Sequence, residues 1–474
     1  MRTYDLIVIG SGPAGQSAAE LSAFLGHSAL IVEQAAPGGV VTTTGGAPTK
    51  TLREIALGLS RDRGSAIDGD VASTFAASLE SVRGTTLGVC RSLQDATARQ
   101  IESSGVDLLH GTARLTSNRT VVIARADGTI EEVGAKAIVL ATGSRPVRFP
   151  GIPFDDPDIY DSNEIFTMRR LPRDIVIAGG GPVGVEFATI FAALDVPVTL
   201  VDSNERLLPT MDGELTALLA GELADRGVVL AMGARVNAVS RRNDRLVVSL
   251  SNGSSIETAA VLFAAGRAAN TEGLGLELAG VALDGKGRIV VDRYFQTTCP
   301  GVYAVGDVAG QTLASLAAQQ GRVAACHAFG LAFGVPVDRA PSAAVYGLPE
   351  LAGVGATEEQ LRRSGGAYVV GRCDLSSTAR GAIAGRGGCL KLLVSADDRR
   401  LLGVHCIGDV ASELVGMGHA VLHMGGTIDV FLTLALNTPT YSAAYRTAAI
   451  DAMGQLVALA RHSALASLTT GAQS

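Results

Sequence analysis

The chain has 474 residues, 47% of them hydrophobic, and a formal charge of −7. This length suits two to four domains with large cores, and an acidic balance without clustered Lys and Arg argues against nucleic acid and anionic membrane surfaces as partners. No apolar run reaches the roughly 18 residues of a membrane span. The chain opens on a strand over Tyr4–Ile9 instead of a signal sequence, so we expect a cytoplasmic protein.

A dinucleotide-binding fingerprint follows this strand. It consists of a glycine turn, a helical pattern over Ser17–Leu25, a second strand over Ala29–Val32 and an acidic residue. In such a motif the first glycine allows the tight turn, the second lets the backbone approach a pyrophosphate at the helix N-terminus, and the third permits close helix–strand packing. The acid accepts hydrogen bonds from the adenosine ribose. The predicted contact residues are Gly10, Gly12, Pro13, Ala14, Gly15 and Glu33.

A helical stretch separates this fingerprint from the next strands. Its composition predicts helices over Thr49–Gly105, with breaks around Gly64–Gly69 and at Gly84. Further predicted elements are strands at Val106–His110 and Thr120–Ala124, a hairpin turn at Gly128–Thr129, and an apolar strand from Ala137 that ends in Thr142 and Gly143.

The fingerprint then recurs. A strand over Ile175–Ala178 precedes a second glycine turn, a helix through Phe191 and a strand over Val198–Val201. Two fingerprints in one chain indicate two bound dinucleotides, usually one flavin and one nicotinamide nucleotide. The predicted contact residues of the second are Gly179, Gly181, Gly184 and Asp202.

The rest of the chain repeats the strand–glycine pattern and then changes character. One strand runs from Val261 to Gly266, and another from Gly301 places the carboxylate of Asp307 at its end, before a helix over Leu313–Leu331. After Pro341 we expect an α+β region and a disordered tail of about a dozen residues. Its predicted strands are Val369–Val370, Leu390–Val394 and Leu401–Ile407, and its predicted helices are Ser412–Met424 and Tyr441–Ala460.

These landmarks, in this order, resemble the FAD-dependent pyridine nucleotide–disulfide oxidoreductase family over nearly the whole chain. The resemblance implies FAD at the first fingerprint, with Thr142 and Gly143 beside the flavin and Asp307 on its ribitol, and a nicotinamide nucleotide at the second. It also implies a homodimer, because Pro341–Gly355 is similar to the opening of the family's dimerisation domain. Further cofactor-contact positions carried over from the family are Gly39, Lys50, Gly266 and Gly306.

The expected fold is therefore α/β, with two Rossmann-like three-layer nucleotide-binding domains plus an α+β C-terminal dimerisation domain. The expected FAD-binding domain comprises residues 1–148 and 271–339, the NAD(P)-binding domain residues 149–270, and the dimerisation domain residues 340–474. Within the family, Pro48–Glu54 and Asn437–Ala449 are most similar to the transhydrogenases.

The redox cysteines of that family are absent. Their two positions hold Val41 and Gly46, and the six cysteines are scattered without a CxxC pair, as suits a reducing compartment. The family's C-terminal acid/base pair of His and Glu is absent too, since its positions hold Thr438 and Ala443. Without a thiolate, no disulfide can relay electrons from the flavin, so we do not expect chemistry on a dithiol substrate.

Residues for hydride transfer remain. Lys50 and Glu186 resemble the Lys–Glu pair that the family sets beside flavin N5, where a positive charge favours the anionic reduced flavin; each could instead be a solvated helix residue. Tyr441 either covers the face of the partner's flavin that the cysteines vacated or packs in the subunit interface. Five histidines are interpreted as structural, without metal-ligand spacing, so no metal site is expected: His110, His327, His405, His419 and His423.

The expected reaction is ping-pong. Hydride passes from NAD(P)H to flavin N5, the oxidised nucleotide leaves, and an unidentified acceptor takes the electrons directly. Three readings stay open: a transhydrogenase whose acceptor is a second nicotinamide nucleotide, a dehydrogenase that uses a quinone, dye or oxygen, and a catalytically silent flavoprotein that binds or regulates. Asp202 would repel a 2′-phosphate and Asn204 stands where an arginine would attract it, so NADH should be preferred, although Arg206 could still reach that phosphate.

Overall fold

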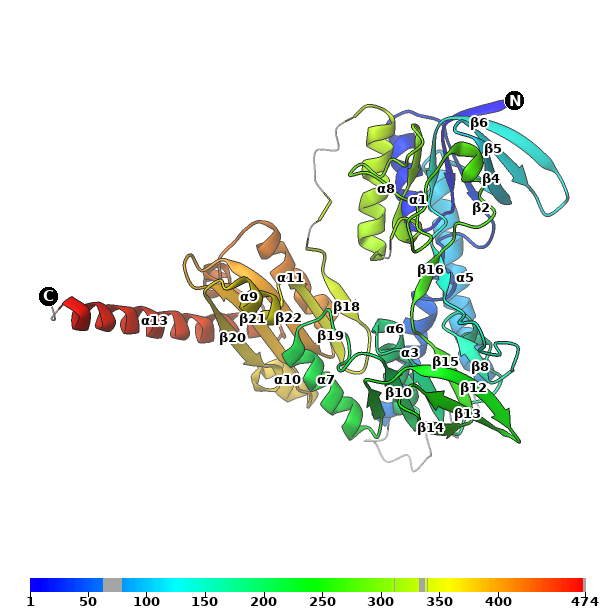
Figure 1. The fold of residues 1–474 in the computed structure, drawn as a ribbon. Coiled ribbons are helices and arrows are strands. Elements are labelled where there is room, and N and C mark those ends of the chain that lie inside the picture. Colours follow the sequence, from blue (N-terminus) through cyan, green and yellow to red (C-terminus); the bar gives the residue numbers. More distant parts are fainter. Residues whose placement is uncertain (63–78, 311, 332–336, 339, 472–474) are drawn as a thin grey trace. The chain divides into compact units, whose positions relative to one another are not determined.

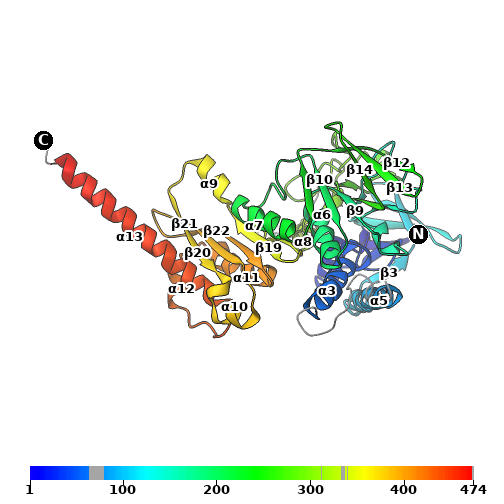
Figure 2. The same ribbon diagram turned by 90° about the horizontal axis from the view of Figure 1, so that it is seen from below.

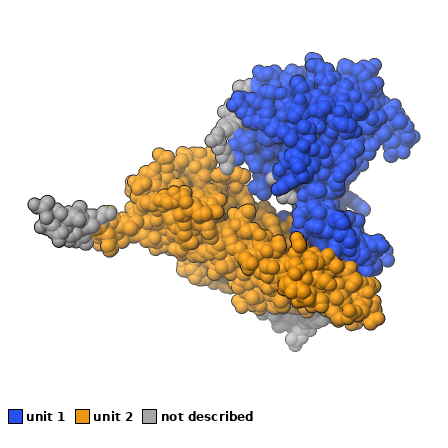
Figure 3. Space-filling view, viewed as in Figure 1, with its two compact units in different colours: residues 1–55, 68–171, 262–339 blue, residues 56–67, 172–261, 340–474 orange. Residues whose placement is uncertain are grey.

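The computed structural model describes residues 1–62, 79–310, 312–331, 337–338 and 340–471. The chain divides into two compact units (Figure 3): Met1–Ile55, Asp68–Leu171 and Leu262–Arg339 in the first, and Ala56–Ile67, Pro172–Val261 and Ala340–Ser474 in the second. The division into three domains expected from the sequence stays a prediction. Among the described residues, no helix combines the length and apolar character that crossing a membrane requires.

The first unit is built on a mixed sheet with the order β3-β2-β1-β6-β5-β4, in which β17 also pairs with β6 (Figure 1). The pairs β1–β2, β2–β3, β1–β6 and β17–β6 are parallel, whereas β4–β5 and β5–β6 are antiparallel. The strands of the unit are β1 (Arg2–Ile9), β2 (Ala29–Glu33), β3 (Asp107–His110), β4 (Thr112–Ser117), β5 (Thr120–Ala124), β6 (Ile130–Leu140), β7 (Ser144–Pro146), β8 (Ile159–Asp161), β16 (Arg267–Ala269) and β17 (Val302–Ala304).

Both faces of this sheet are buried, because neighbouring residues of a strand point to opposite sides. Ile7 lies in one apolar cluster, and Leu6 and Val8 lie in another, which also receives residues of α1 and α8. A Cβ on Gly321 of α8 would stand 2.1 Å from the backbone oxygen of Ala14 in α1, so glycine at this position permits the two helices to touch. The helices that begin in this unit are α1 (Pro13–Phe24), α2 (Val40–Thr43), α3 (Ala47–Asp62), α5 (Leu79–Ser103) and α8 (Ala314–Ala328), and its 3₁₀ turns are η1 (Glu164–Thr167), η2 (Glu277–Ala279) and η3 (Gly306–Val308).

Two local predictions in this unit have opposite outcomes. The hairpin turn is confirmed, since Gly128 has a φ of +85° and the Arg125 amide donates to the Thr129 oxygen at 2.9 Å. The helix break at Gly84 is wrong, because α5 is continuous through it; one glycine costs a long helix only about 1 kcal/mol. The break predicted around Gly64–Gly69 lies outside the described residues.

The second unit begins with a sheet in the order β11-β10-β9-β15, in which the pairs β10–β11 and β9–β10 are parallel. The chain also forms an antiparallel sheet, β12-β13-β14. The strand predicted at Ile175–Ala178 is confirmed as β9. The elements are β9 (Ile175–Ala178), α6 (Pro182–Ala193), β10 (Val198–Asp202), α7 (Gly213–Asp225), β11 (Val229–Met232), β12 (Val236–Arg242), β13 (Arg245–Leu250), β14 (Ser255–Thr258) and β15 (Ala260–Phe263).

The same unit ends in an antiparallel sheet, β18-β19-β22-β21-β20, with helices packed against it. Tyr445 anchors the last helix, since its buried hydroxyl donates to the Leu414 oxygen at 2.9 Å and accepts from the Gly418 amide at 3.0 Å. The elements are β18 (Ala343–Val345), β19 (Glu350–Gly355), α9 (Glu358–Ser364), β20 (Tyr368–Asp374), η4 (Leu375–Ser377), α10 (Ala379–Ala384), β21 (Cys389–Ser395), β22 (Leu401–Gly408), α11 (Ala411–His423), α12 (Asp429–Thr433) and α13 (Ala443–Gly471).

The disordered tail predicted at the end of the chain is wrong over most of its length. The final helix, α13, continues past Ala460 to Gly471 (Figure 2). Alanine and leucine, both strong helix formers, recur in this stretch and extend the helix. Together the two units confirm the expected class, α/β with two Rossmann-like sheets and an α+β C-terminal region.

Candidate functional site

The first glycine turn has the shape that a bound pyrophosphate requires. Gly10 has a φ of +102°, and a Cβ on Gly15 would stand 2.0 Å from the Gly10 oxygen, so both positions need glycine. A Cβ on Gly12, by contrast, would meet nothing within 4 Å, which leaves open space before the first turn of α1. Gly39, with a φ of +59°, lies beside this space, since its Cβ would be 3.0 Å from the Gly12 Cα. The amides at the start of α1 can therefore reach an anion.

Glu33 is tied to the same turn. Its Oε2 accepts hydrogen bonds from the Ser11 amide at 2.8 Å and the Ser11 hydroxyl at 2.6 Å, and its Oε1 accepts from the Ala35 amide at 2.9 Å. A carboxylate offers about four acceptor positions, so Oε1 keeps one for a ribose hydroxyl. The sequence did not single out Ser11, which holds this carboxylate in place.

Asp307 belongs to a second hydrogen-bonded group of the first unit. Its carboxylate accepts from the Ser144 hydroxyl at 2.5 Å and from the Thr312 amide at 3.0 Å, and Arg267 donates to the same Ser144 hydroxyl at 2.8 Å. Ser144 and Arg267 are site residues that sequence reasoning missed. Their positions in the sequence could have indicated them, because Ser144 directly follows Gly143 and Arg267 directly follows Gly266, two glycines predicted to contact the cofactor.

Two further strand ends with predicted flavin-contact residues, at Thr142 and at Gly306, are also held by hydrogen bonds. The Thr142 hydroxyl donates to the Asn270 oxygen at 2.7 Å, and the Asn270 side chain returns a bond to the Thr142 oxygen at 2.8 Å. Gly306, with a φ of +73°, donates its amide to Gln320 Oε1 at 2.8 Å. Asn270 and Gln320 thus position the predicted flavin-contact residues without having been predicted themselves.

The two positions that hold the redox cysteines in the family, here Val41 and Gly46, lie close together. A Cβ on Gly46 would stand 2.4 Å from the Val41 oxygen, so this backbone has no room for a side chain at Gly46.

The hydroxyl oxygens of Thr44 and Thr312 are buried without a hydrogen-bond partner in the described structure. Buried hydroxyls normally have partners, and both of these lie in segments predicted to contact FAD. The residues present therefore fit an FAD group.

The second glycine turn repeats the first. Gly179 has a φ of +121°, and a Cβ on Gly184 would stand 1.8 Å from the Gly179 oxygen, whereas one on Gly181 would meet nothing within 4 Å. Asp202 accepts from the Gly180 amide at 2.5 Å and from the backbone and side-chain nitrogens of Asn204 at 2.7 Å each. The geometry suits a nicotinamide nucleotide whose adenosine ribose lies at the end of β10.

The three predicted catalytic residues lie in different parts of the structure. Lys50 is on α3 in the first unit, while Glu186 is on α6 in the second, 5% exposed, with its carboxylate accepting the Tyr346 amide at 3.0 Å. Their pairing therefore stays a prediction. Tyr441 packs against the apolar core of the C-terminal sheet, and its role toward a partner subunit also stays a prediction.

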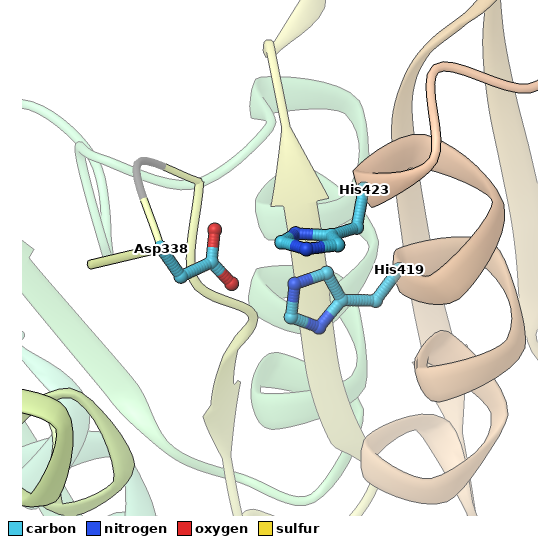
Figure 4. Close-up of side chains that lie close together, drawn as sticks. All are labelled: Asp338, His419 and His423. Carbon is cyan, nitrogen blue, oxygen red and sulfur yellow. The ribbon is translucent and has the colours of Figure 1, made fainter. Parts of the chain in front are cut away.

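Two histidines have a metal-ligand spacing that the interpretation of the sequence overlooked. His419 and His423 lie one turn apart on α11 (Figure 4), and four residues is a spacing at which two helical histidines can share a metal ion. His405, in contrast, is structural: burial lowers its pKa, and its Nε2 lies 2.9 Å from the Ala356 oxygen.

Comparison with known proteins agrees with this geometry. Residues 4–321 match the model of the pyridine nucleotide–disulphide oxidoreductases, and residues 341–449 match the dimerisation domain of those enzymes. The soluble pyridine nucleotide transhydrogenase of Mycobacterium bovis is 39% identical over 473 residues, covering 97% of this chain and 99% of that protein. The transhydrogenase of Colwellia psychrerythraea is 33% identical over 459 residues, covering 96% and 98%.

Solved structures show the same likeness. LpdA from Mycobacterium tuberculosis superposes with a TM-score of 0.86 at 26% identity, covering 95% of this chain and 99% of that one. The Cu(II) complex of the HOCl-induced flavoprotein disulfide reductase RclA from Escherichia coli gives 0.85 at 26% identity, with the same coverage.

The chain therefore belongs to the pyridine nucleotide–disulphide oxidoreductase family. It is an FAD-dependent oxidoreductase of pyridine nucleotides, and its dimerisation domain indicates a homodimer.

Proposed function

We propose that the protein transfers hydride between nicotinamide nucleotides without a redox disulfide. The observation that carries this proposal is the pair Val41 and Gly46 at the cysteine positions, where a Cβ on Gly46 would stand 2.4 Å from the Val41 oxygen. The net reaction, NADPH plus NAD⁺ giving NADP⁺ plus NADH, balances without another reactant. The relatives named soluble pyridine nucleotide transhydrogenase, which align over nearly their whole length, support this choice of acceptor.

Each part of the site has a task in this reaction. FAD, when bound, supplies a ring that accepts hydride and passes two electrons on. Gly12, Glu33 and Asp307 hold that group, and Asp202 binds the ribose of the nicotinamide nucleotide. Lys50 places a positive charge that stabilises developing negative charge, with Glu186 as the carboxylate that positions it. The remaining predicted residue, Tyr441, shields the reacting face from water.

The test separates the acceptors. The FAD-loaded protein is reduced anaerobically with NADPH or NADH and then mixed with either thionicotinamide-NAD⁺ or a soluble quinone. We expect reoxidation by the nucleotide analogue, and loss of reduction in Lys50→Met but not in Lys136→Met, whose lysine is 75% exposed. Failure of the purified protein to take up FAD would overturn the proposal.

A second candidate, an NADH dehydrogenase that passes electrons to a quinone or dye, is favoured by Asp202. Its fixed carboxylate suits NADH and disfavours the NADPH that a transhydrogenase must also bind. Fast reoxidation by the quinone, with none by thionicotinamide-NAD⁺, would establish this candidate. A protein that is not reduced by either nucleotide would instead be a silent flavoprotein.

A further inference from the structure

The C-terminal end of α11 carries two histidines on one side. The rings of His419 and His423 are nearly perpendicular, at 87°, with centroids 6.4 Å apart, and one ring nitrogen of each lies within 4.8 Å of the other (Figure 4). His423 is exposed and His419 half-buried, so solvent reaches the pair. The two histidines alone define the site; Asp338, also labelled in Figure 4, belongs to the first unit.

The helix beneath them is held in place. Leu414, Gly418 and Val421 of α11 are buried, and Gly418 also donates its amide to the Tyr445 hydroxyl at 3.0 Å. The backbone of the pair is therefore fixed, and binding an ion between the rings requires rotation of the side chains only. Two nitrogens on one metal ion at about 2.0–2.1 Å lie roughly 3 Å apart, a closure of less than about 2 Å that histidine χ angles can supply.

We propose that His419 and His423 chelate a late first-row divalent metal ion, with water in the remaining positions. Imidazole nitrogens suit Cu²⁺, Ni²⁺ and Zn²⁺, and the order of affinities places Cu²⁺ first. Mg²⁺ and Ca²⁺ are disfavoured because they require oxygen ligands. The position adds to the affinity, since His423 is the last residue of α11 and a helix C-terminus attracts cations. This site is independent of the proposed hydride transfer.

The test uses the full-length, oxidised, FAD-loaded protein without any nicotinamide nucleotide. Cu²⁺ is titrated in the presence of glycine as a competitor and followed by electron paramagnetic resonance. We expect one strong site per chain with hyperfine coupling from two imidazole nitrogens. His419→Ala and His423→Ala should each weaken binding at least tenfold. His462→Ala should leave binding unchanged, because His462 is an exposed histidine of α13 without a histidine one turn away.

A second measurement keeps the test valid if an alanine variant folds poorly. In wild-type protein, Cu²⁺ should protect His419 and His423, but not His462, from diethyl pyrocarbonate, as read by peptide mass spectrometry. Equal Cu²⁺ affinity in the doubly substituted protein, or equal modification of all three histidines with and without Cu²⁺, would overturn the proposal.

Discussion

Hydrogen bonds hold both the carboxylate of Asp202 and the guanidinium of Arg206, four residues further along the chain. Asp202 accepts two hydrogen bonds from Asn204 of its own loop and a third from the Gly180 amide of the second glycine turn. The guanidinium of Arg206, which the sequence alone left able to reach a 2′-phosphate, donates to the Pro209 oxygen at 2.8 Å, the Met211 oxygen at 3.1 Å and the Thr216 hydroxyl at 2.9 Å. Moving it to a phosphate would break all of these bonds. The fixed negative charge of Asp202, beside an arginine whose guanidinium is already engaged, should therefore decide nucleotide choice.

We predict that NADH reduces the FAD-loaded protein at least about tenfold more efficiently than NADPH, a difference of about 1.4 kcal/mol. Asp202→Asn combined with Asn204→Arg should shift the ratio towards NADPH, because it removes the repelling charge and adds an attracting one. Anaerobic stopped-flow rate constants measure the ratio, and Asp225→Asn, an exposed acid at the end of α7, serves as control. A wild-type preference for NADPH would show that this interpretation of Asp202 is wrong.

The sequence predicts the turn glycines of the site but not the residues that position its side chains. Glycines such as Gly10 and Gly184 are predictable because their spacing reflects backbone constraints within one turn. The bond between Ser144 and Asp307 joins residues 163 positions apart, and Arg267 reaches Ser144 across 123 positions. No local pattern encodes such partners, so these positioning residues emerge only once the strands are assembled.

Among the secondary-structure elements, a buried ion cluster joins α7 and α9 to β21. Lys391 of β21 is completely buried, and its Nζ lies 2.9 Å from Asp212, 2.8 Å from Glu214 and 2.6 Å from Glu358. Burial by itself would lower the pKa of Lys391, but the three carboxylates raise it above its usual value. The lysine therefore stays charged and holds the loop before α7 to the C-terminal sheet.

Replacing Lys391 with methionine should destabilise the protein strongly. Removing one partner of a buried ion pair leaves uncompensated charge and costs about 3–5 kcal/mol. The midpoint of urea unfolding measures the loss. Lys286→Met removes an exposed lysine and should change stability by less than about 0.5 kcal/mol. A Lys391→Met protein as stable as the wild type would contradict the role of the cluster.

The same cluster should make stability depend on pH through Glu214. The hydrogen bond from Arg372 is the main cause that lowers the pKa of Glu214 from 4.5 to about 2. Because the folded-state pKa is depressed, the stabilisation is complete above about pH 4.5 and is lost as the pH falls towards 2. Glu214→Gln should flatten the acid limb of the stability profile, whereas Glu222→Gln, an exposed acid of the same helix, should not. An unchanged acid limb in Glu214→Gln would rule out this contribution.

Strands are predicted from the sequence more accurately than helix ends. The apolar run at Ile175–Ala178 coincides with β9 because a strand buried on both faces has little polar sequence within it. The helices α5 and α13 run through Gly84 and past Ala460, where glycine and small polar residues predict breaks. Helix continuity depends on packing and on neighbouring strong helix formers, which a local signal underestimates.

For the whole molecule, the match of residues 341–449 to a dimerisation domain predicts a homodimer. Sedimentation at micromolar concentration should give twice the chain mass of 48.4 kDa. If Tyr441 covers the partner's flavin, Tyr441→Ala should raise the rate at which oxygen reoxidises the reduced protein. Tyr294→Ala, which removes an exposed tyrosine of the first unit, should leave that rate unchanged. A monomer that remains fully active would contradict the assembly expected from the family.

Electron flow through the whole molecule should not involve any thiol. All six cysteines are free; five are buried and Cys389 is half-buried. Burial raises the pKa of Cys389 to about 11 and raises those of Cys90, Cys373 and Cys406 as well, so these thiols are protonated and poorly reactive near pH 7. We predict that treatment with iodoacetamide leaves NADH-driven flavin reduction unchanged and that reduction produces no thiolate–flavin charge-transfer band. A family member with an intact disulfide, alkylated after reduction, serves as the positive control. Loss of flavin reduction after alkylation of one identified cysteine would place a thiol in the electron path and contradict direct transfer to the acceptor.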